Sequence, residues 1–170
     1  MAIQVSEYIE VGKRAIELGC EVSTGIAVLP ANFTTASSKR DLIHYDMAAT
    51  LRTLWRQAGV DETPLEGAGE RLPRLMQESS DLLLPTIFCS ALLLSQNPSA
   101  ISVALSVISS YVTDWLKGLS GDKIVKLGIV VEHKTGACTL VDYEGPPGGL
   151  QELPEILREV QPSDAKSYEG

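Results

Sequence analysis

One polar segment, residues 32–46, carries most of the side chains that could bind or act on a ligand. Hydroxyl groups and two cations lie there between a predicted strand and a predicted helix. Phosphate groups bind at such junctions because backbone N–H groups and the helix dipole converge on them. No glycine-rich phosphate-binding motif is present, so a solvated connection with a helix cap is the competing interpretation. The candidate ligand-binding residues are Asn32, Thr34, Ser37, Ser38, Lys39, Arg40 and His44.

A histidine with carboxylate neighbours can act as a general base, and His44 lies close to Asp46. The nucleophile would have to come from elsewhere, and Cys20 and Cys89 are the conceivable thiols. Cys89 lies in an apolar stretch, which raises the pKa of a thiol and makes it inert. Asp46 is also placed to cap the helix that follows. The pattern therefore favours capping and packing, and no catalytic residue is predicted.

Metal binding has no support in the spacing of the possible ligands. The motifs HExxH and paired CxxC are both absent, and the histidines and cysteines are scattered. We therefore expect neither a metal site nor a cofactor, and the sequence favours a non-enzymatic role. The residues considered are Cys20, His44, Cys89, His133 and Cys138.

The run from Leu82 to Leu116 is apolar and holds a single side chain of the Asp, Glu, Lys and Arg types, Asp114. Such a run must be buried in a protein core, in a subunit interface or in a bilayer. Pro85 near its start and the pair Asn97-Pro98 divide it. We expect a helix over residues 86–95, a tight turn, and a long central helix over residues 99–117.

The long helix is expected to carry two parallel stripes, one apolar and one of small hydroxyl residues. Small residues let another backbone approach closely, and a solvent-facing helix would normally carry Lys and Glu instead. Aromatic residues beside small ones are common at the centre of interfaces. The sequence therefore predicts self-association through this helix. The candidate interface residues are Ser102, Ser106, Ser109, Tyr111, Thr113 and Trp115.

Membrane insertion of the same run is an alternative with less support. Each half is shorter than the ~20 residues that span a bilayer, and no basic flank fixes an orientation.

The remaining periodicities predict secondary structure on both sides of the apolar run. Alternation over residues 123–143 is the clearest signal and indicates a β-hairpin with a turn at 134–137. Glycines at 19 and 59 are placed to end the two early helices. The other expected elements are a helix over 5–18, a strand within 25–29, a helix over 44–58, a short helix over 71–78 and a closing amphipathic helix over 150–160.

The 170 residues favour one domain over residues 1–160, followed by a polar tail at 161–170. The predicted class is α+β, with mixed α/β as the alternative. A net charge of −8 argues against nucleic acid as a partner, because an acidic protein gains nothing from counterion release. Three cysteines and an N-terminus without the pattern of a signal peptide favour the reducing cytoplasm.

These observations lead to one functional hypothesis with two alternatives. The leading hypothesis is a cytoplasmic, non-enzymatic interaction or assembly protein that self-associates through the apolar helices of residues 86–117. The first alternative is a small-ligand-binding or regulatory protein that uses residues 32–46. The second is a membrane-active effector that uses residues 82–116.

Overall fold

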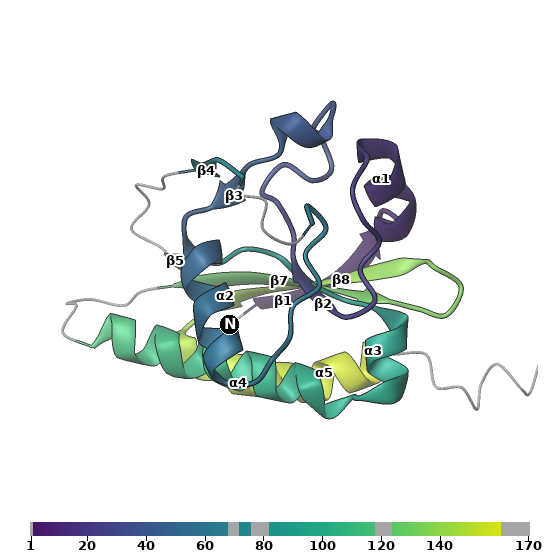
Figure 1. Cartoon of the computed structure of the whole chain (residues 1–170). Coiled ribbons are helices and arrows are strands. Elements are labelled where there is room, and N and C mark those ends of the chain that lie inside the picture. The colour runs from purple at the N-terminus through teal and green to yellow at the C-terminus, as the bar shows by residue number, and fades with distance from the viewer. Residues whose placement is uncertain (1, 68–71, 76–81, 118–123, 161–170) are drawn as a thin grey trace, which may run out of the picture.

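The computed structural model describes residues 2–67, 72–75, 82–117 and 124–160. A six-stranded mixed sheet in the order β1-β8-β7-β6-β2, with β5 beside β7, separates two layers of helices and loops (Figure 1). This arrangement confirms the predicted α+β class. The strands of this sheet are β1 (Ala2–Tyr8), β2 (Ile26–Val28), β5 (Leu82–Leu83), β6 (Ile87–Cys89), β7 (Val125–Glu132) and β8 (Cys138–Gly145). Strands β3 (His44–Tyr45) and β4 (Arg74–Leu75) pair in parallel as a separate two-stranded sheet.

The helices lie on both faces of the sheet. Helices α3, α4 and α5 cover one face, and α1 lies on the other (Figure 1). The α-helices are α1 (Val11–Leu18), α2 (Met47–Gln57), α3 (Ala91–Gln96), α4 (Ser99–Leu116) and α5 (Leu153–Val160), and the 3-10 helices are η1 (Lys39–Asp41) and η2 (Pro147–Glu152).

The predicted C-terminal hairpin is confirmed by the antiparallel pairing of β7 with β8. The backbone N–H of His133 donates to the carbonyl of Ala137, and Gly136 takes a left-handed conformation with φ of 94°. Glycine adopts that conformation without a steric penalty, which suits the tight turn. The hydroxyl of Tyr143 then donates to the carbonyl of Pro146 and fixes the loop after β8. The predicted closing amphipathic helix follows as η2 and α5.

The expected helix over residues 86–95 is wrong in its first half. Residues Ile87–Cys89 form β6, a buried strand next to β7, and the helix α3 starts only at Ala91, with the hydroxyl of Ser90 as its cap. A strand buried on both faces reads as a continuous apolar run, just as a buried helix does. The long helix over residues 99–117 is confirmed as α4.

Strands β5 and β6 lie consecutively along β7 with a change of register between them. Leu82 pairs with Val125, whereas Ile87 pairs with Ile129. The chain that runs from β5 to β6 therefore holds one residue more than the part of β7 beside it. Such an insertion is a β-bulge, and Pro85 lies inside it. Proline has no N–H to donate to a sheet, so the bulge is a position that tolerates it.

The expected helix over residues 5–18 is also wrong in its first half. Residues Ala2–Tyr8 form β1, which pairs with β8 along its whole length, and α1 begins only at Val11 after the extended Glu10. The pairing with a distant strand overrides the local helical spacing. The predicted end of the helix is correct, because Gly19 has a left-handed φ of 77°.

Three smaller predictions have mixed outcomes. The strand within residues 25–29 is confirmed as β2, and the helix over 44–58 is shorter than expected because His44 lies in β3. Asp46 stands at the N-cap of α2, but its side chain accepts no cap hydrogen bond. The helix expected over 71–78 is wrong where the chain is described, since Arg74–Leu75 form β4. Its other residues and the tail at 161–170 lie outside the described residues, apart from 72 and 73.

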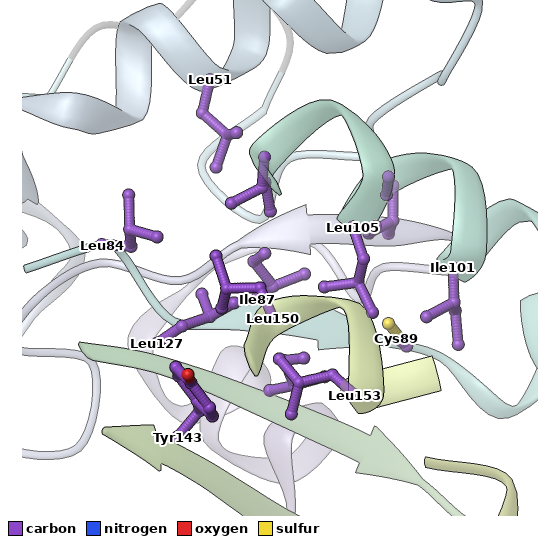
Figure 2. Packing of buried hydrophobic residues seen from close by; sticks show 14 of the residues in the cluster. Leu51, Leu84, Ile87, Cys89, Ile101, Leu105, Leu127, Tyr143, Leu150 and Leu153 are labelled. Atoms are coloured by element: carbon purple, nitrogen blue, oxygen red, sulfur yellow. The ribbon is translucent and has the colours of Figure 1, made fainter. Parts of the chain in front are cut away.

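Two hydrophobic clusters flank the sheet. The larger joins the inner faces of α2, α4 and α5 to the sheet, with Ile87, Leu105, Leu127 and Leu153 among its members (Figure 2). The smaller packs α1 and the segment after β2 against the opposite face. Strand β7 contributes to both clusters, which follows from the alternation of side chains along a strand.

Trp55 links α2 to α4 and should be among the most costly residues to truncate. Its ring is fully buried, and its indole N–H donates to the carbonyl of Ala104 over 3.3 Å. We expect Trp55→Ala to lower the free energy of unfolding by about 3–5 kcal/mol. The exposed neighbour Gln57, changed to Ala, should stay within about 0.5 kcal/mol. Urea denaturation of both variants measures the difference, and equal midpoints would contradict this assignment.

Candidate functional site

The first candidate region, residues 32–46, is held together from within. The side-chain amide of Asn32 donates to the carbonyl of Asp41 over 2.8 Å, and its oxygen accepts from the N–H of Ile43 over 2.9 Å. The side chain of Asn32 thus links the start of the segment to the backbone near its end, at Asp41 and Ile43. Ser38 donates to the carboxylate of Asp41 over 3.1 Å. These contacts give Asn32 and Ser38 a structural role.

The other predicted ligand-binding residues of this region do not converge on one point. Thr34, Ser37 and Arg40 are exposed, and Lys39 is partly buried at the start of η1. His44 is buried and faces a different set of partners. The structure therefore brings Asn32 and Ser38 together at Asp41, where one bonds the backbone carbonyl and the other the side-chain carboxylate. It does not gather the hydroxyls, the cations and His44 around a shared site.

Arg14, which the sequence did not single out, anchors this segment to α1. Its guanidinium donates to the carbonyl of Phe33 over 2.9 Å and to the carbonyl of Ala36 over 2.5 Å. An arginine that satisfies two backbone carbonyls of a turn stabilises the turn.

His44 belongs to a buried ionic cluster with three residues that sequence analysis missed. The Nε2 atom of His44 lies 2.5 Å from Oε2 of Glu66, and the guanidinium of Arg52 lies 3.0 Å from the same carboxylate. Arg52 also pairs with Glu62 over 2.6 Å, and Glu62 accepts the N–H of Val28 over 2.9 Å. The cluster therefore ties β2, α2 and β3 together through alternating charges.

The chemistry of this cluster is that of a structural clamp. Burial by itself raises the pKa of Glu66, but the hydrogen bond and charge of His44 and the charge of Arg52 outweigh it and lower that pKa. Glu66 is therefore held as a carboxylate between its two partners. The second ring nitrogen of His44, Nδ1, is buried and has no hydrogen-bond partner among the described residues. His44 is only 4% exposed, so its ring lies almost entirely inside the protein.

Two of the three thiols, Cys89 and Cys138, are buried, whereas Cys20 is partly buried. Burial raises the pKa of Cys89 to about 12 and also raises the pKa of Cys138. A thiol with a raised pKa is a poor nucleophile. Among the described residues, no group of three or more His, Cys, Asp and Glu side chains is arranged to hold a metal ion.

The second candidate region is the outer face of α4. Of the predicted interface residues, Ser106, Thr113 and Trp115 are exposed, whereas Ser102 and Tyr111 are partly buried. Ser109 is buried at 8% exposure and faces the core. The hydroxyl stripe is therefore split, because Ser109 lies on the inner side of the helix and Ser106 on the outer side.

An apolar ridge runs beside those hydroxyls. Val103, Val107, Tyr111 and Trp115 follow one another at intervals of four residues. The two ends, Val103 and Trp115, are 44% and 43% exposed, whereas Val107 and Tyr111 are partly buried against the larger hydrophobic cluster. We call these four residues the α4 ridge. Residues spaced by four form a continuous ridge on a helix surface, and Ser102, Ser106 and Ser110 form a parallel row of small side chains beside it. The spacing was visible in the sequence, but only the fold shows which face remains outside.

Helix α4 also satisfies, by length and composition, the criteria for a helix that could cross a membrane. The core helix of a soluble protein passes the same test. Six of its residues are buried against the protein, namely Ile101, Ala104, Leu105, Ile108, Ser109 and Val112.

Comparisons with known proteins leave the function open. No protein-family model, no curated protein and no solved structure matches the chain.

The ionic cluster predicts a specific pH dependence. Because the pKa of Glu66 is lower in the folded chain than its ordinary 4.5, the unfolded chain binds more protons in acid. The stabilisation is complete above pH 4.5 and is lost as the pH falls through the folded-state pKa. We expect Glu66→Gln to lower the free energy of unfolding by about 1–3 kcal/mol at neutral pH. The difference from the wild type should shrink as the solution is acidified below pH 4.5.

Urea denaturation at a series of pH values measures this difference, and Glu159→Gln is the control. Glu159 is exposed on α5, so its variant should follow the wild type closely. A gap between Glu66→Gln and wild type that widens in acid would show that Glu66 is not the clamped carboxylate described above.

Proposed function

We propose that the protein is a non-enzymatic assembly protein of the cytoplasm that associates with a second copy of itself through the outer face of α4. The observation that carries this proposal is the α4 ridge, an apolar row on the outer side of an eighteen-residue helix whose inner side is already packed on the sheet. Exposed apolar rows of this kind mark interaction surfaces.

The shape of the surface supports a second copy as the partner. A ridge with a row of small residues beside it is complementary to itself, since the ridge of one helix fits the groove of another when residues spaced by four interdigitate. A two-fold axis brings the same patch of both copies together. Leu92 on α3, which is 46% exposed, adds apolar surface on the preceding helix.

Charge supports the same partner. The chain has a net charge of −8, so two copies repel each other at most of their surface. On the outer face of α4, the charged residues Asp114 and Lys117 pair with each other over 3.2 Å. The face is therefore close to neutral, and two acidic copies can meet there without placing like charges opposite each other.

The two alternatives are less well supported by the contacts. The segment 32–46 uses Asn32 and Ser38 internally, so it offers fewer polar groups to a ligand than its sequence suggested. A membrane role would have to use the same face of α4, which holds the hydroxyls of Ser106, Ser110 and Thr113 and the pair of Asp114 and Lys117. Those groups favour a protein surface over hydrocarbon.

The proposal is tested by placing a charge in the row of small side chains. Ser106 is exposed, so Ser106→Glu should leave the fold intact and set two carboxylates close together across the two-fold contact. We expect the average mass in solution, measured by light scattering after size-exclusion chromatography, to fall in this variant relative to wild type. Far-ultraviolet circular dichroism should be unchanged.

Ile16→Glu is the matched control, because Ile16 is exposed at 68% on α1, on the other side of the sheet. It should keep the mass of the wild type. The proposal is wrong if Ser106→Glu and Ile16→Glu behave alike, or if the wild type stays monomeric and binds neutral lipid vesicles instead.

A further inference from the structure

In the described part of the chain, strand β1 leaves one edge of the sheet open. It stands at the end of the strand order, and its pairing among the described residues is with β8 alone, from Ala2 with Glu144 to Tyr8 with Cys138. The opposite edge, at β2, is closed, because Glu62 accepts the N–H of Val28 and the N–H of Thr63 donates to the carbonyl of Ile26. The backbone of β2 is thus hydrogen-bonded at its edge, whereas the outer edge of β1 is not paired with another described strand.

An open edge exposes backbone hydrogen-bonding groups, and proteins that stay monomeric usually block it. Charged side chains, especially lysine, and also proline and β-bulges are common blocking devices. Residues 2–8 contain no lysine and no proline, Glu7 is their single charged residue, and their pairing with β8 runs without a bulge. In addition, Val5 at the middle of the strand is 53% exposed. The edge of β1 is therefore suited to pairing with a further strand.

The hydrogen-bond pattern shows which residues face outward. His133 donates to the carbonyl of Ala137, so the alternation along the antiparallel hairpin directs every odd residue of β8 toward β7. The even residues of β8, such as Leu140, are then bonded to β1, where Leu140 is opposite Ser6. The backbone groups directed to the open edge belong to the odd residues of β1, which are Ile3, Val5 and Glu7.

We propose that β1 pairs antiparallel with β1 of a second copy, about a two-fold axis at Val5, so that the two sheets become one. In this register Val5 is opposite Val5 of the second copy and Ile3 is opposite Glu7. All three outward residues then form hydrogen-bonded pairs, and each pair exchanges two backbone hydrogen bonds. Other registers leave one or more of those residues unpaired.

Charge selects this register as well. Glu7 is the only charged residue of β1. With the axis at Val5, the two copies of Glu7 are separated by roughly 14 Å along the strands, which exceeds the screening length of about 8 Å in physiological salt. A register centred on Glu7 would place the two carboxylates directly opposite each other, which is destabilising.

The side chains agree with the backbone. Val5 lies beside Val141, which is part of the larger hydrophobic cluster, so it points to the face that carries α4 and α5. Opposed residues of an antiparallel pair lie on the same face, and β-branched pairs stabilise that arrangement. The contact would bury the exposed Val5 of both copies. This inference rests on the proposed assembly function, but it uses a surface separate from the α4 ridge.

Proline substitutions test which backbone groups face outward. Val5→Pro removes an N–H directed to the open edge and places a ring there, so pairing with β8 should survive. We expect this variant to fold normally and to have a lower mass in solution than wild type. Ser6→Pro is the matched control, because it removes an N–H bonded to β8, and it should lower the thermal midpoint clearly.

Cysteine substitutions test the register. In a hydrogen-bonded pair the Cα atoms are about 5.5 Å apart, which a disulfide can bridge. Val5→Cys should therefore form a disulfide-linked dimer on mild oxidation. Gln4→Cys should not, because its two copies would be roughly 8 Å apart in this register. The wild type under the same oxidation controls for its own cysteines.

The two proposals fail in different ways. The β1 pairing is wrong if Val5→Pro keeps the wild-type mass, or if Gln4→Cys cross-links as well as Val5→Cys. The α4 contact would then still be supported by a loss of mass in Ser106→Glu. If Val5→Pro and Val5→Cys behave as expected while Ser106→Glu keeps its mass, the β1 contact stands and the role of α4 is wrong. The combined variant of Val5→Pro and Ser106→Glu should be monomeric.

Discussion

The burial of β7 is the constraint on which the rest of the fold depends. Val125–Glu132 is bonded to β8 along one edge and to β5 and β6 along the other. Its side chains enter the hydrophobic clusters on both faces of the sheet, with Ile129 in one and Val130 in the other. A strand enclosed in this way fixes the positions of all its neighbours. It also places β1 at the outer end of the sheet and α4 on one face of it.

The features that could be predicted from the sequence are those encoded locally. The hairpin follows from alternation over residues 123–143, and α4 follows from helical spacing after the break at Pro98. The early strand β1 and the central strand β6 could not be predicted, because their pairing partners lie more than 40 residues away along the chain. For such segments, tertiary pairing overrides the local preference.

The same distinction applies to the candidate sites. The sequence indicated self-association through residues 86–117, and it drew attention to Ser106 and Trp115, which the fold leaves exposed. It did not show that Ser109 faces the core, nor that His44 is enclosed with Glu66. The open edge at β1 is a property of the strand order alone, so no pattern within residues 2–8 could have indicated it. Both proposed contacts are two-fold, and two such contacts on one chain favour assemblies with an even number of copies.

Native mass spectrometry of the wild-type protein, prepared without detergent, tests the central claim of self-association most directly. The monomer has a mass of 18.3 kDa. The account predicts species at even multiples of that mass, with a dimer at low concentration and larger even assemblies as the concentration rises. A single species at 18.3 kDa throughout the micromolar range would contradict it.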